Sequence, residues 1–272
     1  MQGYTHYSER PAPTGYPSGG TPYPGYGAAA PAAAPVRTAP NTHIKPTTPE
    51  EQRAFLRGYD FFVLIDSSGS MKFDVERGCG ESRWETVKEY LQFIVKEAVE
   101  FDPDGVEVCF FGTRVKWIKK PVESSESVNA AFNEIKKPRG STNLTDALDE
   151  TFKRHIDRKK SNPNQKSIIL VITDGAANDP TKVESKVRGM TRKLDATKIF
   201  DCRNSTGETI KTTLEMGIRF FQVGDDEEAK DFLENLDENL KGAKADIVDT
   251  GDIEELTGSD GVRQALVNAI WE

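Results

Sequence analysis

Short, solid runs of apolar residues alternate with longer stretches of helical spacing over most of this chain. Solid runs are typical of strands buried on both faces of a parallel sheet, and apolar residues three and four positions apart are typical of helices that cover such a sheet. Because the two patterns alternate from Gln52 onward, the sequence predicts a three-layer, doubly wound α/β fold, with a mostly parallel six-stranded sheet and helices on both faces.

The individual elements follow from where each pattern starts and stops. The expected strands cover residues 61–66, 106–111, 115–118, 167–173, 218–223 and 245–248. The expected helices cover residues 83–102, 128–135, 144–155, 180–194, 229–240 and 262–270. Residues 195–209 have no apolar pattern and are interpreted as a surface excursion, and residues 210–216 as a helical turn stopped by Gly217.

The first 50 residues differ in composition from the rest. They hold ten of the fifteen prolines and five of the seven tyrosines, and Ala, Gly, Ser and Thr fill most of the remainder. Such a segment cannot bury enough apolar surface to offset its ordering entropy. Residues 1–50 are therefore expected to form a disordered tail, and residues 51–272 the folded domain.

Charge and cysteine usage narrow the class of partner. The first 58 residues carry a net charge of +2 and the remainder −10, so nucleic acid is not an expected partner, because phosphate binding needs a basic surface. No signal-peptide pattern and no apolar stretch of membrane-spanning length is present. Three isolated cysteines, Cys79, Cys109 and Cys202, suit a reducing compartment. We therefore expect a cytoplasmic protein.

Two of the expected strands, which are also the two most apolar, end in an aspartate, Asp66 or Asp174. Such strands are expected to be central and adjacent, and ligands of doubly wound sheets bind at the carboxyl ends of strands where the strand order reverses. Hydroxyls accompany the two acids, because Ser68 and Ser70 follow Asp66 and Thr142 lies in a loop before a helix. Facing carboxylates repel unless a proton or cation lies between them, and such oxygens are the ligands that Mg²⁺ prefers.

These residues resemble a known motif. The segments Asp66-Ser67-Ser68-Gly69-Ser70, Gly140-Ser141-Thr142-Asn143 and Thr173-Asp174-Gly175 look like the three parts of the metal-ion-dependent adhesion site of the von Willebrand factor A family. They occur in the family's order, and the resemblance extends from about Tyr59 to Trp271. It implies a Rossmann-like fold and one Mg²⁺ or Mn²⁺ ion. It also implies that Ser68, Ser70 and Thr142 bind the ion directly, and that Asp66 and Asp174 bind it directly or through water.

The resemblance implies a non-enzymatic interaction module, in which the cation accepts an acidic side chain from a protein partner. The alternative is a metal-dependent hydrolase or chelatase-type subunit, in which the ion activates water. No general base is evident for that chemistry, because His155 is the only histidine after residue 50. Two further alternatives stay open: a decayed site that binds no ion, and a structural domain whose tail carries the function. The sequence leaves the oligomeric state open.

Three departures from the family pattern affect the choice of partner rather than the ligands. Leu144 stands where many relatives have a second threonine, the loop 71–83 is long, and residues 197–209 resemble an insertion.

Overall fold

The computed structural model describes residues 44–75, 80–203 and 209–271. Contacts within the chain divide it into Met1–Pro40 and Asn41–Glu272. The expected tail therefore falls largely outside the described residues, as does Cys79. The sequence placed the start of the folded domain near residue 50, and the first described residue is Ile44.

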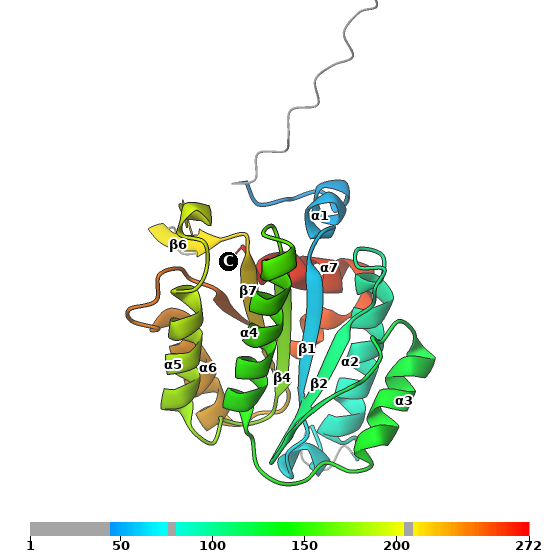
Figure 1. Ribbon diagram of the computed structural model, residues 1–272. Coiled ribbons are helices and arrows are strands. Elements are labelled where there is room, and N and C mark those ends of the chain that lie inside the picture. Colours follow the sequence, from blue (N-terminus) through cyan, green and yellow to red (C-terminus); the bar gives the residue numbers. More distant parts are fainter. Residues whose placement is uncertain (1–43, 76–79, 204–208, 272) are drawn as a thin grey trace, which may run out of the picture. The chain divides into compact units, whose positions relative to one another are not determined.

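One mixed sheet forms the centre of the folded unit, and its strands run parallel except for β3 (Figure 1). The strand order is β3-β2-β1-β4-β7-β8, which confirms the expected sheet of six mostly parallel strands. The strands of this sheet are β1 Asp60–Asp66, β2 Glu107–Phe111, β3 Val115–Trp117, β4 Ser167–Thr173, β7 Met216–Gln222 and β8 Val248–Asp252. The chain builds outward from β1 to one edge and then from β4 to the other, so the strand order reverses between β1 and β4.

Helices cover both faces of the sheet, as the alternating pattern predicted (Figure 1). The α-helices are α1 Pro49–Leu56, α2 Arg83–Ala98, α3 Ser125–Ile135, α4 Leu144–Ser161, α5 Pro180–Thr191, α6 Glu227–Glu238 and α7 Gly258–Asn268. The short 3₁₀ helices are η1 Ser70–Lys72, η2 Ala196–Lys198 and η3 Ile253–Leu256. None of the helices in the described part of the chain is long and apolar enough to span a membrane.

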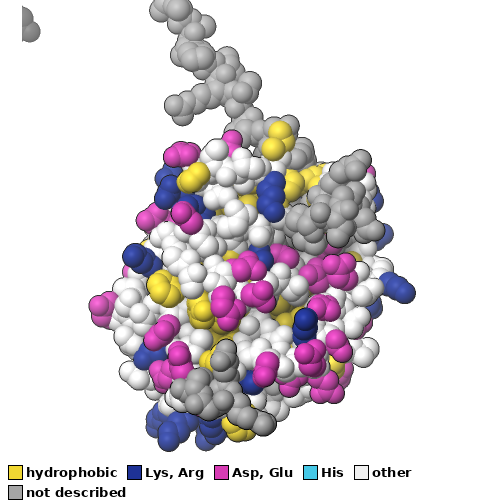
Figure 2. Space-filling model, turned by 180° about the vertical axis from the view of Figure 1, so that it is seen from behind, with side chains coloured by type: hydrophobic (Ala, Val, Ile, Leu, Met, Phe, Trp, Pro, Cys, Tyr) yellow, Lys and Arg dark blue, Asp and Glu magenta, His cyan; other side chains and the backbone are white. Residues whose placement is uncertain are grey.

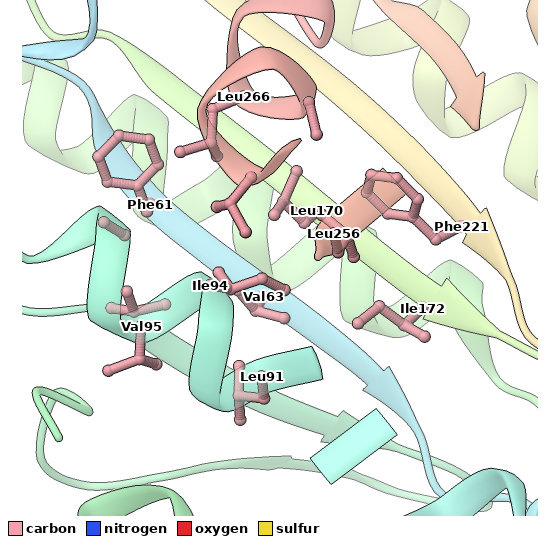
Figure 3. Close-up of a cluster of buried hydrophobic side chains, with 14 of the residues drawn as sticks. Phe61, Val63, Leu91, Ile94, Val95, Leu170, Ile172, Phe221, Leu256 and Leu266 are labelled. Atoms are coloured by element: carbon pink, nitrogen blue, oxygen red, sulfur yellow. The ribbon is translucent and has the colours of Figure 1, made fainter. Parts of the chain in front are cut away.

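Alternate side chains of the central strands feed two separate hydrophobic cores, because successive residues of a strand point to opposite faces. Phe61, Val63 and Ile65 lie in the core beneath α2, α3 and α7, which Figure 3 shows in part. Phe62 and Leu64 lie in the opposite core beneath α4, α5 and α6. Burial on both faces fixes β1 in place, and its last residue, Asp66, is held with it.

Side-chain caps set the starts of two helices. Asp179, directly before Pro180, accepts a hydrogen bond from the backbone N of Lys182 at the start of α5. Ser82 accepts one from the backbone N of Glu85 at the start of α2. Helix α2 ends at Ala98 rather than near Asp102, and the side chain of Asp102 accepts a hydrogen bond from the backbone N of Phe61.

The prediction for residues 195–216 was wrong. This segment contains η2 and an antiparallel pair of strands, β5 Ile199–Arg203 and β6 Thr209–Thr213, where a loop and a helical turn were expected. The ring of Phe200 packs on Trp271 with centroids 5.6 Å apart. These two short strands lie outside the main sheet and carry little apolar periodicity, so the pattern did not reveal them.

Two further differences concern the edges of the fold. Helix α1 precedes the first expected element, and its start is set by a capping box at Thr48 with Pro49 at the first position. Strand β8 begins at Val248, where a strand over 245–248 was expected. Ala245 and Ile247 are buried before the ladder begins, whereas β8 itself lies at the sheet edge and carries mainly polar residues.

Candidate metal site

The two aspartates singled out in the sequence lie side by side at the carboxyl edge of the sheet. Asp66 is the last residue of β1, and Asp174 follows the last residue of β4. The strands pair in parallel, with Ile65 opposite Ile172. The prediction that these strands are adjacent at the point of strand-order reversal is therefore confirmed.

A chain of oxygen atoms joins the first loop to Asp174. The Ser68 and Ser70 hydroxyls lie 3.0 Å apart, and the Ser70 hydroxyl donates to Oδ1 of Asp174 at 2.9 Å. The loop geometry explains this, because η1 begins at Ser70, four residues after the end of β1, and the Ser70 hydroxyl points to the residue after β4. Ser68 and Asp174 are almost fully buried. Three of the five predicted ligands therefore converge.

Asp66 forms hydrogen bonds with residues of both strand-end loops at this cluster. Its Oδ1 accepts a hydrogen bond from the backbone N of Ser68 at 2.7 Å, and its Oδ2 accepts one from the Thr173 hydroxyl at 2.8 Å. Burial, and then the negative charge of Asp174, raises the pKa of Asp66 to about 7, although both hydrogen bonds act in the other direction. A positive charge beside these two buried carboxylates would therefore favour the ionised form of Asp66.

Thr142 lies in a loop that is bound to both neighbouring loops. Gly140 accepts a hydrogen bond from the backbone N of Gly69 at 3.1 Å, and Asn178 exchanges two hydrogen bonds with the backbone of Thr142. Gly140 has φ of +93°, and a Cβ there would lie 2.0 Å from the Thr113 hydroxyl, so glycine is required. Among the described residues, no hydrogen bond joins the Thr142 hydroxyl itself to the other four predicted ligands.

Arg83 is a site residue that sequence reasoning missed. Its Nη1 lies 2.9 Å from Oδ2 of Asp174, and its Nη2 lies 3.6 Å from Asp225. The side chain is only 12% exposed, so this pair is poorly screened by water. One signal was available: a cation at the first position of a helix opposes the macrodipole and needs a reason of its own. Asn178, which holds the Thr142 loop, was also missed and has no such local signal.

His155, the histidine weighed as a catalytic base, lies elsewhere. Its Nδ1 is 2.8 Å from the hydroxyl of Ser167, the first residue of β4, and its Nε2 is 3.2 Å from Glu215. Ser167 is at the amino end of β4, and Asp174 follows the carboxyl end, so His155 and the candidate site lie at opposite ends of this strand. His155, Ser167 and Glu215 are fully buried and form an internal hydrogen-bonded group.

The oxygen donors of this cluster are of the kind that a hard cation prefers. Within residues 44–75, 80–203 and 209–271, no group of three or more His, Cys, Asp and Glu side chains is arranged to hold a metal. At the edge between β1 and β4 the available donors are the hydroxyl and carboxylate oxygens of Ser68, Ser70, Asp66 and Asp174. Oxygen donors with few charges fit Mg²⁺ or Mn²⁺ and do not suit ions that prefer thiolate or imidazole ligands.

Comparison with known proteins agrees with this architecture. The family model of the von Willebrand factor type A (VWA) domain matches residues 61–176, from β1 through the loop after β4. The fold is of the VWA type. The matched segment contains all five predicted ligands. A VWA fold is typical of interaction and adhesion modules rather than enzymes.

Several solved structures share the fold. The SpRpn10 VWA domain is 13% identical with a TM-score of 0.50, over 77% of this chain and 96% of that one. The manganese-loaded TRAP protein of Plasmodium vivax is 14% identical with a TM-score of 0.48, over 78% of this chain and 74% of that one. The PilB minor pilin of Streptococcus sanguinis is 15% identical with a TM-score of 0.47, over 78% of this chain and 60% of that one. Identities this low show the fold alone. A search of curated proteins found no similar sequence.

Proposed function

We propose that this VWA domain is a divalent-metal-dependent protein–protein interaction module. The observation that carries the proposal is the hydrogen-bonded chain from the Ser68 hydroxyl through the Ser70 hydroxyl to Asp174. Asp66 is joined to this chain because it accepts a hydrogen bond from the backbone N of Ser68. A cluster of hydroxyls and two carboxylates at the buried carboxyl ends of two central strands does not stabilise the core, since buried polar groups cost free energy unless they have partners. It suits a cation such as Mg²⁺ or Mn²⁺.

Each ligand has a role in this proposal. Ser68, Ser70 and Thr142 contact the ion, and Asp66 and Asp174 hold it directly or through water. Once bound, the cation supplies a positive centre that accepts a carboxylate. The hydrogen bonds that now join Ser68, Ser70 and Asp174 keep their oxygens close together, so little ordering is left for binding to accomplish.

The partner in this proposal is a protein that places an Asp or Glu side chain on the ion. A hydrolytic use of the same site is less favoured, because the buried His155 contacts Ser167 and Glu215 at the opposite end of β4. A cytoplasmic location stays a prediction from the sequence.

Calorimetric titration of Mg²⁺ and Mn²⁺ into metal-stripped protein tests the proposal. Wild-type protein should bind one ion, and Asp66→Ala should bind none while keeping cooperative unfolding. The control is Ser141→Ala, which removes an exposed hydroxyl next to Thr142, in the loop before α4, and outside the ligand set. A free ion concentration 100 times Kd should raise wild-type stability by about 2.7 kcal/mol. Equal titrations for wild type and Asp66→Ala would overturn the proposal.

A further inference from the structure

A groove of about 690 Å³ adjoins the candidate metal site. It lies between the turn after β2, the end of α3 and the loop before α4, and Ser67 and Gly140 form the side nearest the site. Arg139 donates its backbone N to Ser67 O at 2.7 Å, and Gly140 is bound to Gly69. The groove and the oxygen cluster thus share the same backbone, so an extended segment that reaches one can continue into the other.

The charges that line this groove are predominantly basic. Arg114, Lys116, Lys137 and Arg139 line it, against a single acid, Glu134. Glu134 pairs with Lys116 at 3.0 Å. Arg114, Lys137 and Arg139 are exposed, and in the described part of the chain their side chains form no ion pair or hydrogen bond. Three unpaired cations therefore face the groove.

This distribution contrasts with the rest of the domain. The chain has a net charge of −8. Asp and Glu side chains gather over the centre and one side of the rear face (Figure 2). A second groove, at the carboxyl ends of β7 and β8, is lined by seven acids and one lysine. Like charges placed together repel one another unless a partner neutralises them. Exposed cations are solvated one by one, but three unpaired cations gathered on an otherwise acidic domain form a surface of positive potential that attracts an anion.

The backbone at the rim of this groove is strained. Lys136, which caps α3, has φ of +65°, and it is the only residue other than glycine with positive φ among the described residues. Its ψ of −67° and the hydrogen bond from the backbone N of Lys137 to the carbonyl oxygen of Ile135 at 2.8 Å make this a γ-turn of the rare, strained form, which costs about 1 kcal/mol or more. The turn directs the chain into Lys137 and Arg139, so the strain accompanies the presentation of the basic side chains.

We propose that the groove binds an acidic segment of the protein partner, in continuation of the carboxylate that binds the metal. One Asp or Glu of the segment reaches the ion, and further acids lie against Arg114, Lys137 and Arg139. The inference rests on the proposed function and makes the partner more specific. An acidic peptide fits better than nucleic acid, because the basic row is short, belongs to a chain of net negative charge, and ends at a site that takes a carboxylate.

The test uses the full chain and a labelled peptide of ten glutamates, with a peptide of ten glutamines as the neutral probe. Fluorescence anisotropy is measured with Mg²⁺ or Mn²⁺ and with chelator. The groove variant combines Arg114→Gln, Lys137→Gln and Arg139→Gln. The matched control combines Lys96→Gln, Lys119→Gln and Lys120→Gln, three exposed lysines outside the groove. Lys119 and Lys120 follow β3. This strand runs away from the carboxyl ends of the parallel strands, since Val115 pairs with Phe111 and Trp117 with Cys109.

Wild-type protein should bind the glutamate peptide in a salt-sensitive manner, and the groove variant should bind it at least about tenfold more weakly, because removal of rim charges reduces electrostatic attraction. The control should stay within about twofold of wild type, as expected for charges remote from the interface. Equal loss in both variants, or no binding by wild type, would overturn the inference. Tighter binding of heparin fragments or single-stranded DNA would replace the acidic peptide with another polyanion.

Calorimetric metal titration of the groove variant separates the two proposals. If the groove variant binds the ion like wild type but keeps full peptide affinity, the groove inference fails and the metal site stands. If neither protein binds the ion, the proposed function fails, and peptide binding in the presence of chelator then shows whether the basic groove acts alone.

Discussion

The guanidinium of Arg83 is the single side chain that most changes the electrostatics of the candidate site. It donates a hydrogen bond to Oδ2 of Asp174, while Oδ1 accepts a hydrogen bond from the Ser70 hydroxyl. A fixed cation there neutralises part of the charge that would otherwise attract a divalent ion.

Replacement of this cation should have opposite effects on stability and on metal affinity. Arg83→Gln leaves Asp174 with one fewer partner, so the metal-free protein should lose about 3 kcal/mol, as when a buried ion pair loses one member. Mg²⁺ or Mn²⁺ should bind more tightly than to wild type, because a nearby positive charge is gone. Chemical denaturation and calorimetry measure the two effects.

The control for this variant is Arg53→Gln, which removes an exposed pair with Glu100 at 3.9 Å and should cost less than about 1 kcal/mol. Weaker metal binding by Arg83→Gln would show that the guanidinium supports the ion rather than opposing it.

Glu215 makes the free energy of unfolding of the domain depend on pH in the acid range. Burial opposes its ionisation, but hydrogen bonds from His155, Lys159 and the backbone of Asp195 outweigh burial and lower its pKa from 4.5 to about 2. A carboxyl whose pKa is lower in the folded state stabilises the fold above its unfolded pKa. That contribution is therefore complete above about pH 5 and is lost as the pH falls from 4.5 toward 2.

Urea denaturation at a series of pH values checks this dependence. Wild-type stability should fall over this acid window, and Glu215→Gln should be less stable at neutral pH with a flatter profile. Parallel profiles for the two proteins would assign the acid sensitivity to other carboxyls.

At the scale of elements, the contact between β7 and the end of α7 leaves no space for a side chain. A Cβ at Gly217 would lie 1.7 Å from the carbonyl oxygen and 2.6 Å from the carbonyl carbon of Ala269, and both of these atoms belong to the backbone. The sequence interpretation gave Gly217 the role of stopping a helical turn, but in the structure it is a residue of β7. Its small size is what allows the closing helix to pack on the sheet.

Gly217→Ala should therefore lower the free energy of unfolding by about 3 kcal/mol or more, since overpacking against backbone cannot be relieved by a rotamer change. Gly189→Ala is the matched control, because a Cβ at that position of α5 meets nothing within 4 Å. It should stabilise the protein by about 0.5–1 kcal/mol, as alanine is the better helix former. A small effect of Gly217→Ala would mean that α7 can shift without loss.

At the scale of the whole molecule, the folded unit begins before the boundary drawn from composition. Helix α1 packs on α7, its Leu56 is fully buried, and Gln52 hydrogen-bonds to Arg263 and Gln264. The apolar pattern gave no signal for α1, because a helix of 8 residues offers only about two turns of periodicity. Its place in the fold depends on residues more than 200 positions later in the chain.

Two truncations test this boundary. Removal of residues 1–43 should leave the thermal midpoint and the metal affinity unchanged, because α1 and its capping box at Thr48 remain. Removal of residues 1–57 should lower stability by about 2–5 kcal/mol, the usual loss for a deleted large buried side chain such as Leu56. Equal midpoints for both truncated proteins would show that α1 contributes nothing to the folded unit.

The sequence alone determined the strands β1 and β4 and the aspartate at the end of each, because buried parallel strands are continuous apolar runs and the residues of each loop motif are close in sequence. It also determined the two-sided helical cover. Only the tertiary structure decided that Arg83 faces Asp174, that β5 and β6 pair, and that Arg114, Lys137 and Arg139 line one groove. The contacts of Arg83 and the lining of the groove bring together residues from separate segments of the chain, and the two strands of the β5–β6 pair carry little apolar periodicity, so none of these arrangements leaves a pattern in the sequence.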